Sequence, residues 1–401
     1  MEHDKTEQKY ILITSSNFPK GGASATYLSL FCRGLKLNGC SIKVLLLKGF
    51  AFGSYTNKSS KRNVTNYGVP YTYLSSPKRP QNQILKIFDD LTSILHLIVF
   101  LISIFNQRKS TSFLIYNNEI QTNIPIYLIA KLFRIRIITF VPEFYDKSEF
   151  HGTFFRKLKW YGFLLNFNYL NRISNKLIIC SHFLKEEYIK QGFHDANIII
   201  QPNLTDFEYW ETKNIEIKFT IGYSGTPYIK DGLNDLFKAL SILQAEGIHL
   251  TLLVIGDSNF GQSLIPKLKE ECSRLGISEK VYFTGLVESA MVKKYLSECK
   301  ILAITRPSIV QTKAGFPTKL GEYFATKRPV LATNFGDIDK YFTNGLDIIM
   351  AECGNPESIA QKIKWMMQNS QVLEMISQNG YNKARELLDF NKAVFRIINL
   401  I

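Results

Sequence analysis

Cysteine is scarce in this sequence, and the cysteines are not spaced as in a metal site. The six cysteines are scattered, no CxxC pair occurs, and the six histidines do not cluster. The spacing therefore indicates neither a zinc site nor a disulfide framework, and a reducing compartment fits best. Residues 1–9 are polar and charged, which argues against a secretory signal. We therefore expect a cytoplasmic protein without a metal site.

Acidic residues are also few compared with basic ones. The 49 Lys and Arg residues exceed the 34 Asp and Glu residues, which gives a net charge of +15. Such a balance favours a negatively charged partner, and nucleic acid, an anionic membrane surface or a nucleotide-activated substrate would each satisfy it. No RNP, helix-turn-helix or zinc-finger signature supports nucleic acid, so we expect none to bind.

Long apolar runs are missing as well, since none reaches the roughly 20 residues that cross a bilayer. The most apolar stretch, 94–105, is interrupted only by His96 and Ser103 and ends a helix predicted over 84–105. Two interpretations remain open for this helix. It is either buried in a core or placed with one face in the membrane interface.

A second predicted helix, 154–165, mixes cations with aromatic residues. Arg156, Lys157 and Lys159 alternate there with Phe, Trp and Tyr. The pattern fits contact with anionic lipid, plain amphipathic packing or, with least support, stacking on single-stranded nucleic acid. Together with the charge of +15, the two helices predict peripheral attachment to an anionic membrane, at the inner face of the cell membrane.

The order of the predicted elements indicates two α/β domains. At 401 residues the chain is too long for one core. Strands and helices alternate from residue 10 onward and again from residue 219, with a polar segment, 205–217, between them. We predict two doubly wound parallel sheets, five-stranded in the second domain, over 1–205 and 206–390. A closing helix, 391–401, is expected to pack back on the first domain, and residues 51–83 are predicted to form a long loop.

One stretch, 315–325, suits a phosphate-bearing ligand. A glycine turn leads into a helix that carries Lys319 and Glu322, and an apolar strand follows. Free N–H groups and the helix dipole favour negative charge at such a helix start, and a carboxylate can accept hydrogen bonds from sugar hydroxyls. From this stretch alone, a plain surface turn remains equally open.

Three further features stand at the ends of predicted strands. The pair Gly21-Gly22 lacks the full GxGxxG spacing, which argues against a dinucleotide site, but paired glycines there permit close approach of a ligand to the backbone. Glu143 follows a strand where ligands collect in open parallel sheets, and a solvated loop carboxylate is the equally open alternative. Asp337 and Asp339 match a DxD pattern, but two carboxylates alone make a poor magnesium cage.

Short motifs also follow one another in a fixed order. They are Gly21-Gly22, 180–184, Pro202-Asn203 with Asp206, 223–225 with 230–232, 283–285, Arg306-Pro307 and 315–325. In this order the sequence resembles the family 4 glycosyltransferases of the GT-B fold, especially those of bacterial surface polysaccharide assembly. The resemblance extends from about residue 10 to residue 391.

The resemblance implies a fold and an activity. The fold is α/β, with two Rossmann-like parallel-sheet domains, N-terminal for the acceptor and C-terminal for the nucleotide-sugar, facing a central cleft. The activity is that of a retaining, metal-independent glycosyltransferase without a cofactor. It would move a sugar from a UDP- or GDP-linked donor to a saccharide or lipid-linked saccharide acceptor, in capsule, O-antigen or exopolysaccharide synthesis.

The resemblance also implies roles for single residues. Lys230 and Arg306 would hold the diphosphate, and Glu322 would hold the ribose hydroxyls; these three are the catalytic candidates. Further donor contacts are expected from Gly22, Gly225, Thr226, Gly285, Leu286, Phe316, Pro317, Lys319, Leu320 and Gly321. Acceptor-side contacts are expected from Gly21, Glu143, Phe144 and Ser181.

Three positions depart from the family pattern. Ala314 stands where many members carry a first glutamate, Pro142 where a histidine is usual, and Thr226 where an arginine is common. We expect Glu143 to take over a polar role from the missing histidine. The departures keep two alternatives open, a nucleotide-sugar epimerase of related fold and a catalytically impaired partner protein.

Overall fold

The structure is a computed structural model that describes residues 8–50, 62–116, 119–150, 152–212, 215–258 and 262–401. It divides into two compact units. The N-terminal domain comprises residues 1–202 with 390–401, and the C-terminal domain comprises residues 203–389. The boundaries predicted from the sequence are 205/206 and 390/391.

The N-terminal domain is built on an eight-stranded sheet with the order β3-β4-β2-β1-β5-β6-β7-β8. All neighbouring strands are parallel except the antiparallel pair β3 and β4. All six residues of β5 are buried, as expected for a parallel strand covered on both faces. The strands are β1 (Lys9–Thr14), β2 (Ser41–Leu46), β3 (Asn63–Asn66), β4 (Val69–Tyr73), β5 (Thr111–Tyr116), β6 (Arg136–Val141), β7 (Lys176–Ile179) and β8 (Ile198–Ile200).

Six α-helices accompany this sheet in the described part of the chain: α1 (Ala23–Leu37), α2 (Gln83–Ser103), α3 (Ile120–Phe133), α4 (Phe154–Leu165), α5 (His182–Lys190) and α15 (Phe390–Ile398). The last helix packs against the first. A Cβ atom on Gly34 of α1 would lie 2.8 Å from the Cβ of Val394, so the absence of a side chain at Gly34 lets the two helices approach closely.

The prediction of a long loop over 51–83 is wrong for residues 63–73, which form two strands. Residues 51–61 lie outside the described residues, but β3 and β4 form a hairpin at the edge of the sheet. Val69, Tyr71 and Tyr73 are buried at alternate positions of β4. This period of two was hidden in the sequence by the Ser, Asn and Lys residues on either side.

Helix α2 fits the expectation of a buried core helix only in part, because Leu97 and Leu101 join the hydrophobic core whereas other apolar residues of the helix are exposed. Its buried residues are Asp89, Ser93, Leu97 and Leu101. The opposite side exposes large apolar side chains, namely Ile84, Leu85, Ile87, Phe88, Leu91, Leu95, Val99 and Ile102. The first half of the helix therefore buries polar groups and exposes apolar ones, the reverse of a helix that serves a core.

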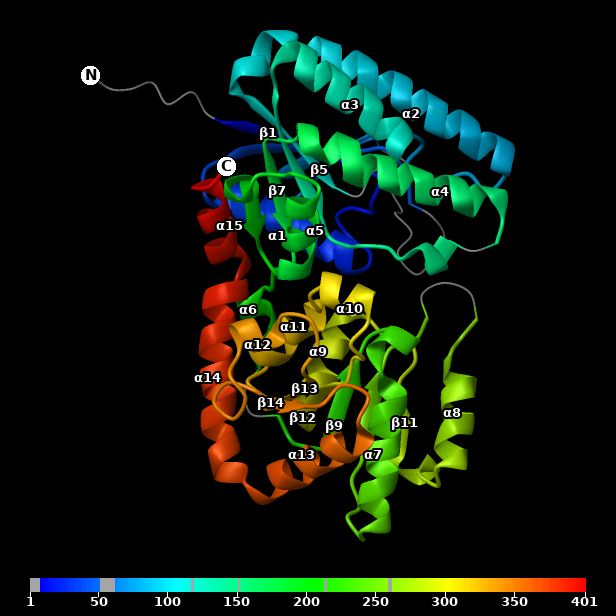
Figure 1. Cartoon of the computed structure of the whole chain (residues 1–401), viewed down its shortest axis with the longest axis vertical. Helices are drawn as coiled ribbons and strands as arrows, with labels where there is room; N and C mark the ends of the chain where they lie inside the picture. Colours follow the sequence, from blue (N-terminus) through cyan, green and yellow to red (C-terminus); the bar gives the residue numbers. More distant parts are fainter. Residues whose placement is uncertain (1–7, 51–61, 117–118, 151, 213–214, 259–261) are drawn as a thin grey trace, which may run out of the picture. The chain divides into compact units, whose positions relative to one another are not determined.

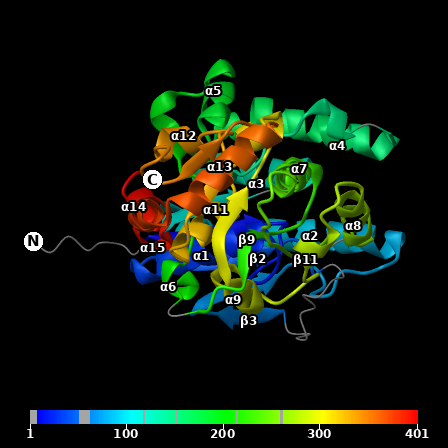
Figure 2. The ribbon, with the colours of Figure 1, turned by 90° about the horizontal axis from the view of Figure 1, so that it is seen from below.

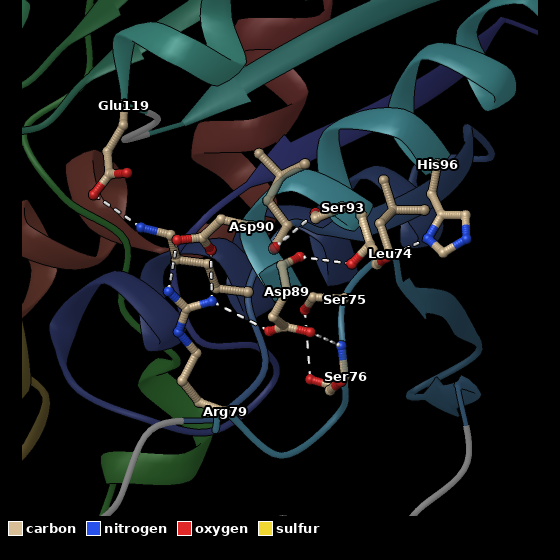
Figure 3. Close-up of polar contacts among 12 residues, drawn as sticks. Leu74, Ser75, Ser76, Arg79, Asp89, Asp90, Ser93, His96 and Glu119 are labelled. Atoms are coloured by element: carbon tan, nitrogen blue, oxygen red, sulfur yellow. Dashed lines mark hydrogen bonds and ion pairs between the residues drawn. The ribbon is translucent and has the colours of Figure 1, made fainter. Parts of the chain in front are cut away.

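Polar contacts hold the inner side of α2 in place (Figure 3). Asp89, Ser93 and His96 each find a partner from outside the helix: Arg79 at 3.2 Å, the Leu47 carbonyl oxygen at 2.8 Å and the Leu74 carbonyl oxygen at 2.7 Å. The guanidinium group of Arg79 also pairs with Asp90. Asp89 and Ser93 are buried, and buried polar groups with such partners fix the rotation of α2, so its apolar side must face outward.

Helices α2, α3 and α4 lie side by side at one end of the N-terminal domain (Figure 1). Apolar side chains are exposed on all three, since Ile124, Leu128 and Leu132 of α3 continue the surface begun on α2. We call the exposed apolar residues of α2, α3 and α4 the three-helix surface. No helix in the described ranges is long and apolar enough to cross a bilayer.

The C-terminal domain is built on a six-stranded parallel sheet with the order β11-β10-β9-β12-β13-β14. Five strands were predicted, and the three-residue strand β14 was missed. The strands are β9 (Phe219–Ser224), β10 (Leu252–Ile255), β11 (Val281–Phe283), β12 (Cys299–Ile304), β13 (Val330–Thr333) and β14 (Ile349–Ala351).

Helices cover this second sheet, and α7 and α13 pack against each other (Figures 1 and 2). The helices are α6 (Phe207–Trp210), α7 (Leu233–Ala245), α8 (Ile265–Arg274), α9 (Ser289–Ser297), α10 (Val310–Ala314), α11 (Thr318–Ala325), α12 (Ile338–Tyr341), α13 (Pro356–Gln368) and α14 (Ser370–Leu388). The linker expected at 205–217 is wrong for its first part, because α6 buries Phe207 and Trp210 in this domain. Residues 213–214 lie outside the described residues.

Candidate active site

The strand order of the C-terminal domain predicts where a ligand would bind. The chain leaves β9 toward β10 on one side and returns to β12 on the other, so the order reverses between β9 and β12. In open parallel sheets, ligands bind beyond the carboxyl ends of the strands at such a reversal. The loops that begin after Ser224 and after Ile304 stand at this place.

Three charged side chains meet there. Oδ1 of Asp231 accepts hydrogen bonds from Nη2 of Arg306 at 2.9 Å and from Nζ of Lys319 at 2.9 Å. The side chains are 4%, 14% and 9% exposed, respectively. We call these residues the charge cluster. They come from the loop after β9, the loop after β12 and the first turn of α11.

The phenol of Tyr223, at the end of β9, completes the surroundings of the lysine. Nζ of Lys319 donates to its hydroxyl oxygen at 3.1 Å and lies 4.3 Å from the centre of its ring. Burial lowers the pKa of Lys319 to about 8, although the carboxylate of Asp231 opposes the shift. Burial alone would raise the pKa of Asp231, but Lys319 and Arg306 hold it below the ordinary value.

A glycine leaves the space that the lysine occupies. A Cβ atom on Gly225 would lie 2.7 Å from Nζ of Lys319 and 3.1 Å from its Cε. The φ angle of Gly225 is +123°, which other residues rarely adopt. Both properties favour glycine at this position, so the turn after β9 fits around the ammonium group.

Helix α11 carries the second candidate group, Glu322. It lies three residues after Lys319, so both side chains are on the same face of the helix. Burial raises the pKa of Glu322 to about 7, although the positive charge of Lys319 opposes the shift. The helix is fixed to the end of β9 by the Tyr323 hydroxyl group, which accepts a hydrogen bond from the backbone N–H of Ser224 at 2.7 Å.

The remaining donor-site predictions fall into two groups. Gly285 and Leu286 follow β11 at the same edge of the sheet, and the side chain of Leu286 is 51% exposed. Phe316, Pro317 and Leu320 are instead buried in the domain. Gly321 is a packing position, because a Cβ atom there would lie 2.0 Å from Oγ1 of Thr205.

Lys230 is not part of the charge cluster. Its side chain is exposed, and within the described residues it makes no hydrogen bond or ion pair with Asp231, Arg306 or Lys319. The carbonyl oxygen of Thr226, in the same loop, accepts hydrogen bonds from the Tyr223 hydroxyl and the Tyr228 N–H. The structure therefore assembles Arg306 with Lys319 and leaves Lys230 outside.

The predicted acceptor-side residues lie in the N-terminal domain. Gly22 is the N-cap residue of α1, directly after Gly21. Glu143 is exposed beyond β6, and one of its carboxylate oxygens accepts a hydrogen bond from the Tyr145 hydroxyl at 2.6 Å. Ser181 is buried and caps α5, with its hydroxyl oxygen 3.2 Å from the backbone N–H of Leu184.

Three further positions singled out in the sequence, namely Phe144, the DxD pattern and Ala314, pack against other residues or form ion pairs. Phe144 forms edge-to-face contacts with Phe163, Phe167 and Phe183. Within the DxD pattern, the carboxylate of Asp337 pairs with Lys340 at 3.0 Å. Ala314 is fully buried, so the position of the missing first glutamate is filled by packing in this chain.

Part of the chain matches the model of a known protein family, and its structure is similar to solved structures. Residues 206–383 match the model of the family described as glycosyl transferases group 1. Over the whole chain, the structure is similar to that of HepE from Anabaena in complex with UDP-glucose. The TM-score is 0.71 at 16% sequence identity, covering 98% of this chain and 100% of that chain. A glycosyltransferase from Rickettsia africae gives a TM-score of 0.71 at 14% identity, covering 98% of each chain.

Two curated relatives of the chain are named glycosyltransferases. The capsular polysaccharide biosynthesis glycosyltransferase CapM of Staphylococcus aureus is 26% identical over 209 residues, which are 51% of this chain and 52% of that protein. An uncharacterized glycosyltransferase of Methanocaldococcus jannaschii is 22% identical over 220 residues, 53% and 56% of the two chains. The chain thus spans about half the length of the curated relatives it matches. Residues 206–383 thus match the glycosyl transferases group 1 model, and the chain has the fold of the GT-B glycosyltransferases to which its structure is similar.

Proposed function

We propose that this protein is a retaining, metal-independent glycosyltransferase that moves a sugar from a nucleoside diphosphate donor to a saccharide acceptor. The observation that carries the proposal is the position of the charge cluster and Glu322 at the strand-order reversal of a group 1 domain. Arg306 and Lys319 offer cations to a leaving diphosphate, and Glu322 offers a carboxylate to the ribose hydroxyls. HepE was solved with UDP-glucose, which supports a donor of this kind.

The acceptor is proposed to be lipid-linked, in capsule or related surface polysaccharide synthesis. The likeness to CapM supports the pathway, and the three-helix surface supports the membrane. On α4, Leu158 and Tyr161 are exposed beside Lys157 and Lys159. Apolar side chains next to cations fit the interface of an anionic membrane, where we place the protein, at the inner face of the cell membrane.

A donor panel followed by a transfer assay tests the proposal. UDP-sugars and GDP-sugars are screened for a rise in melting temperature, because a ligand that binds only the native state stabilises it. The best donor, radiolabelled in its sugar, is then incubated with membrane lipid extracts. Label that moves into the lipid fraction with retained anomeric configuration, in the presence of a chelator, is the expected result. Conversion of the donor sugar to an epimer without acceptor, or binding without turnover, would contradict it.

Binding of UDP-glucose should tighten as the pH rises through 7. Burial raises the pKa of Glu322 to about 7, so its carboxyl group is mostly protonated at pH 6. The ionised form accepts hydrogen bonds with both oxygens, so ribose binding favours loss of the proton, and Kd should fall about eightfold between pH 6 and 7.5. Calorimetry measures this cleanly, because the terminal phosphate of UDP, which titrates near pH 6, is blocked in UDP-glucose. A Kd that stays constant over this range would show that Glu322 does not contact the ribose.

A further inference from the structure

We propose that Asp231 is a positioning residue that aims Lys319 and Arg306 at the donor diphosphate, and that Lys319 takes the role the sequence assigned to Lys230. This inference rests on the proposed function, since it concerns the same site. It adds a carboxylate that the motifs did not mark, and it changes which lysine contacts the phosphates.

The first support is that both cations share one oxygen atom. Oδ1 of Asp231 is 2.9 Å from Nη2 of Arg306 and 2.9 Å from Nζ of Lys319. The two positive groups are therefore held within a few ångström of each other, with one carboxylate between them. One positive charge remains uncompensated in the cluster, and each cation keeps N–H groups that Asp231 does not use.

The second support is that the surrounding backbone accommodates Lys319. Gly225 leaves the space for its ammonium group, and the Tyr223 hydroxyl accepts a hydrogen bond from it at 3.1 Å. A Cβ atom on Gly232 would lie 1.7 Å from the carbonyl oxygen of Thr305, so this glycine brings the loop of Asp231 against the loop of Arg306. Residues from β9, β12 and α11 thus converge on a single arrangement.

The third support is energetic. Two cations and one anion with side chains at most 14% exposed are expensive to desolvate, and replacing such clusters by apolar residues is often neutral or stabilising. Burial also lowers the pKa of Lys319. The charge of Arg306 lowers it further, the carboxyl groups of Asp231 and Glu322 oppose the shift, and the Tyr223 hydroxyl accepts a hydrogen bond from the same ammonium group. Shifted groups gathered where a ligand would bind are typical of functional sites.

The test compares nucleotide with nucleoside. UDP and uridine, and GDP and guanosine, are titrated against the full chain, and the pair that binds more tightly is kept. The ratio of the two affinities isolates the contribution of the diphosphate. Lys319→Met should lower this ratio at least tenfold, as expected for one charge-assisted hydrogen bond, and at least tenfold more than Lys230→Met does. Lys238→Met, an exposed lysine of α7, is the matched control for loss of one charge.

Glu322→Gln should weaken the binding of nucleoside and of nucleotide by the same factor, so the ratio of the two affinities should not change. A larger loss of the ratio in Lys230→Met than in Lys319→Met would overturn the inference. If wild-type protein binds neither nucleotide and transfers no sugar, the proposed function itself fails, which is a different outcome from a wrong choice of lysine.

Asp231→Asn separates positioning from attraction. It removes the anion while both cations remain, so nucleotide affinity should stay equal or rise, whereas kcat should fall at least tenfold because the cations are no longer aimed. Gly225→Ala keeps every charge and displaces the ammonium group, so it should lower both. A purely structural Asp231 would instead lower the melting temperature and leave kcat of the folded protein unchanged. If Asp231→Asn does not fold, Gly225→Ala with unchanged nucleotide affinity overturns the inference.

Discussion

Glu322→Gln should lose most of its affinity for the donor and, at the same time, become more resistant to heat. The ionised carboxylate can accept hydrogen bonds from two ribose hydroxyls, and bonds to charged groups contribute about 1.5–3 kcal/mol each. Loss of about 3 kcal/mol corresponds to a donor affinity lower by more than about a hundredfold. The substituted amide accepts with one oxygen only, so part of the interaction cannot be recovered.

The gain in stability follows from the same burial. A carboxyl group whose pKa is raised from 4.5 to about 7 on folding binds more protons in the native state than in the unfolded state between these values. Its contribution to the free energy of unfolding therefore falls as the pH rises from about 4.5 to 7 and stays low above 7. Near neutral pH the cost is about 2–3 kcal/mol, which glutamine would relieve. Function at the expense of stability is common in active sites.

Melting curves at pH 5 and pH 8, with calorimetric titration of UDP-glucose, measure both effects. The stabilisation should be larger at pH 8 than at pH 5, since the native carboxyl group is protonated at pH 5 and carries little penalty. Glu374→Gln, an exposed helical glutamate of α14 in the same domain, should change neither property. A Glu322→Gln protein that melts earlier than wild type at pH 8 would show that the carboxylate is structural.

The fold of the C-terminal domain could be predicted from the sequence, because its strands are apolar runs separated by amphipathic helices, as in β9 and α7. The sequence was insufficient where the signal was short or mixed. The three residues of β14 and the alternation in β4 did not rise above their polar surroundings. The rotation of α2 could not be read at all, because an apolar stripe looks the same whether it faces a core or the outside. The partners of Asp89, Ser93 and His96, which fix the rotation, lie outside the helix, 10, 46 and 22 positions earlier in the chain.

The candidate site shows the same division. Glu322 could be found because a motif of local residues marks it. Asp231 could not be found, because its role depends on contacts with residues far away in the sequence. Arg306 is 75 positions and Lys319 is 88 positions from it. A motif places Lys230 beside Asp231 in sequence, whereas the fold places Lys319 beside it in space. The only local hint of the cluster that the motifs contained was Gly225. The need for glycine at this position follows from the structure, in which the ammonium group of Lys319 lies next to it.

Replacing two exposed residues of α2, Leu95→Ser together with Val99→Ser, should release the protein from anionic vesicles without loosening its fold. These side chains are 62% and 67% exposed, so the native state gains little from them. If they enter the membrane interface, each contributes about 1–2 kcal/mol on burial. The pair then accounts for about a hundredfold in partitioning, while the free energy of unfolding should change by less than about 0.5 kcal/mol per site.

Leu97→Ala is the matched control on the same helix. Leu97 is fully buried, so its truncation should cost about 2–5 kcal/mol of stability and leave vesicle binding of the folded protein intact. The two variants thus separate the inner side of α2 from its outer side. Equal vesicle binding by wild type and the double variant would remove the three-helix surface from the membrane.

Salt then distinguishes the two forces that would hold the protein on the vesicle. Attraction between anionic lipid and Lys157 or Lys159 weakens as ionic strength rises, because the Debye length shrinks from about 10 Å at 0.1 M to 3 Å at 1 M. The apolar contribution of α2 persists under the same conditions, since burial of apolar surface does not depend on screening. Lys157→Gln with Lys159→Gln should therefore lose binding at low salt and match wild type at high salt, whereas Leu95→Ser with Val99→Ser should be weaker at both. Flotation that is abolished by salt alone would mean that the apolar side of α2 does not enter the interface, and that its exposure serves another partner.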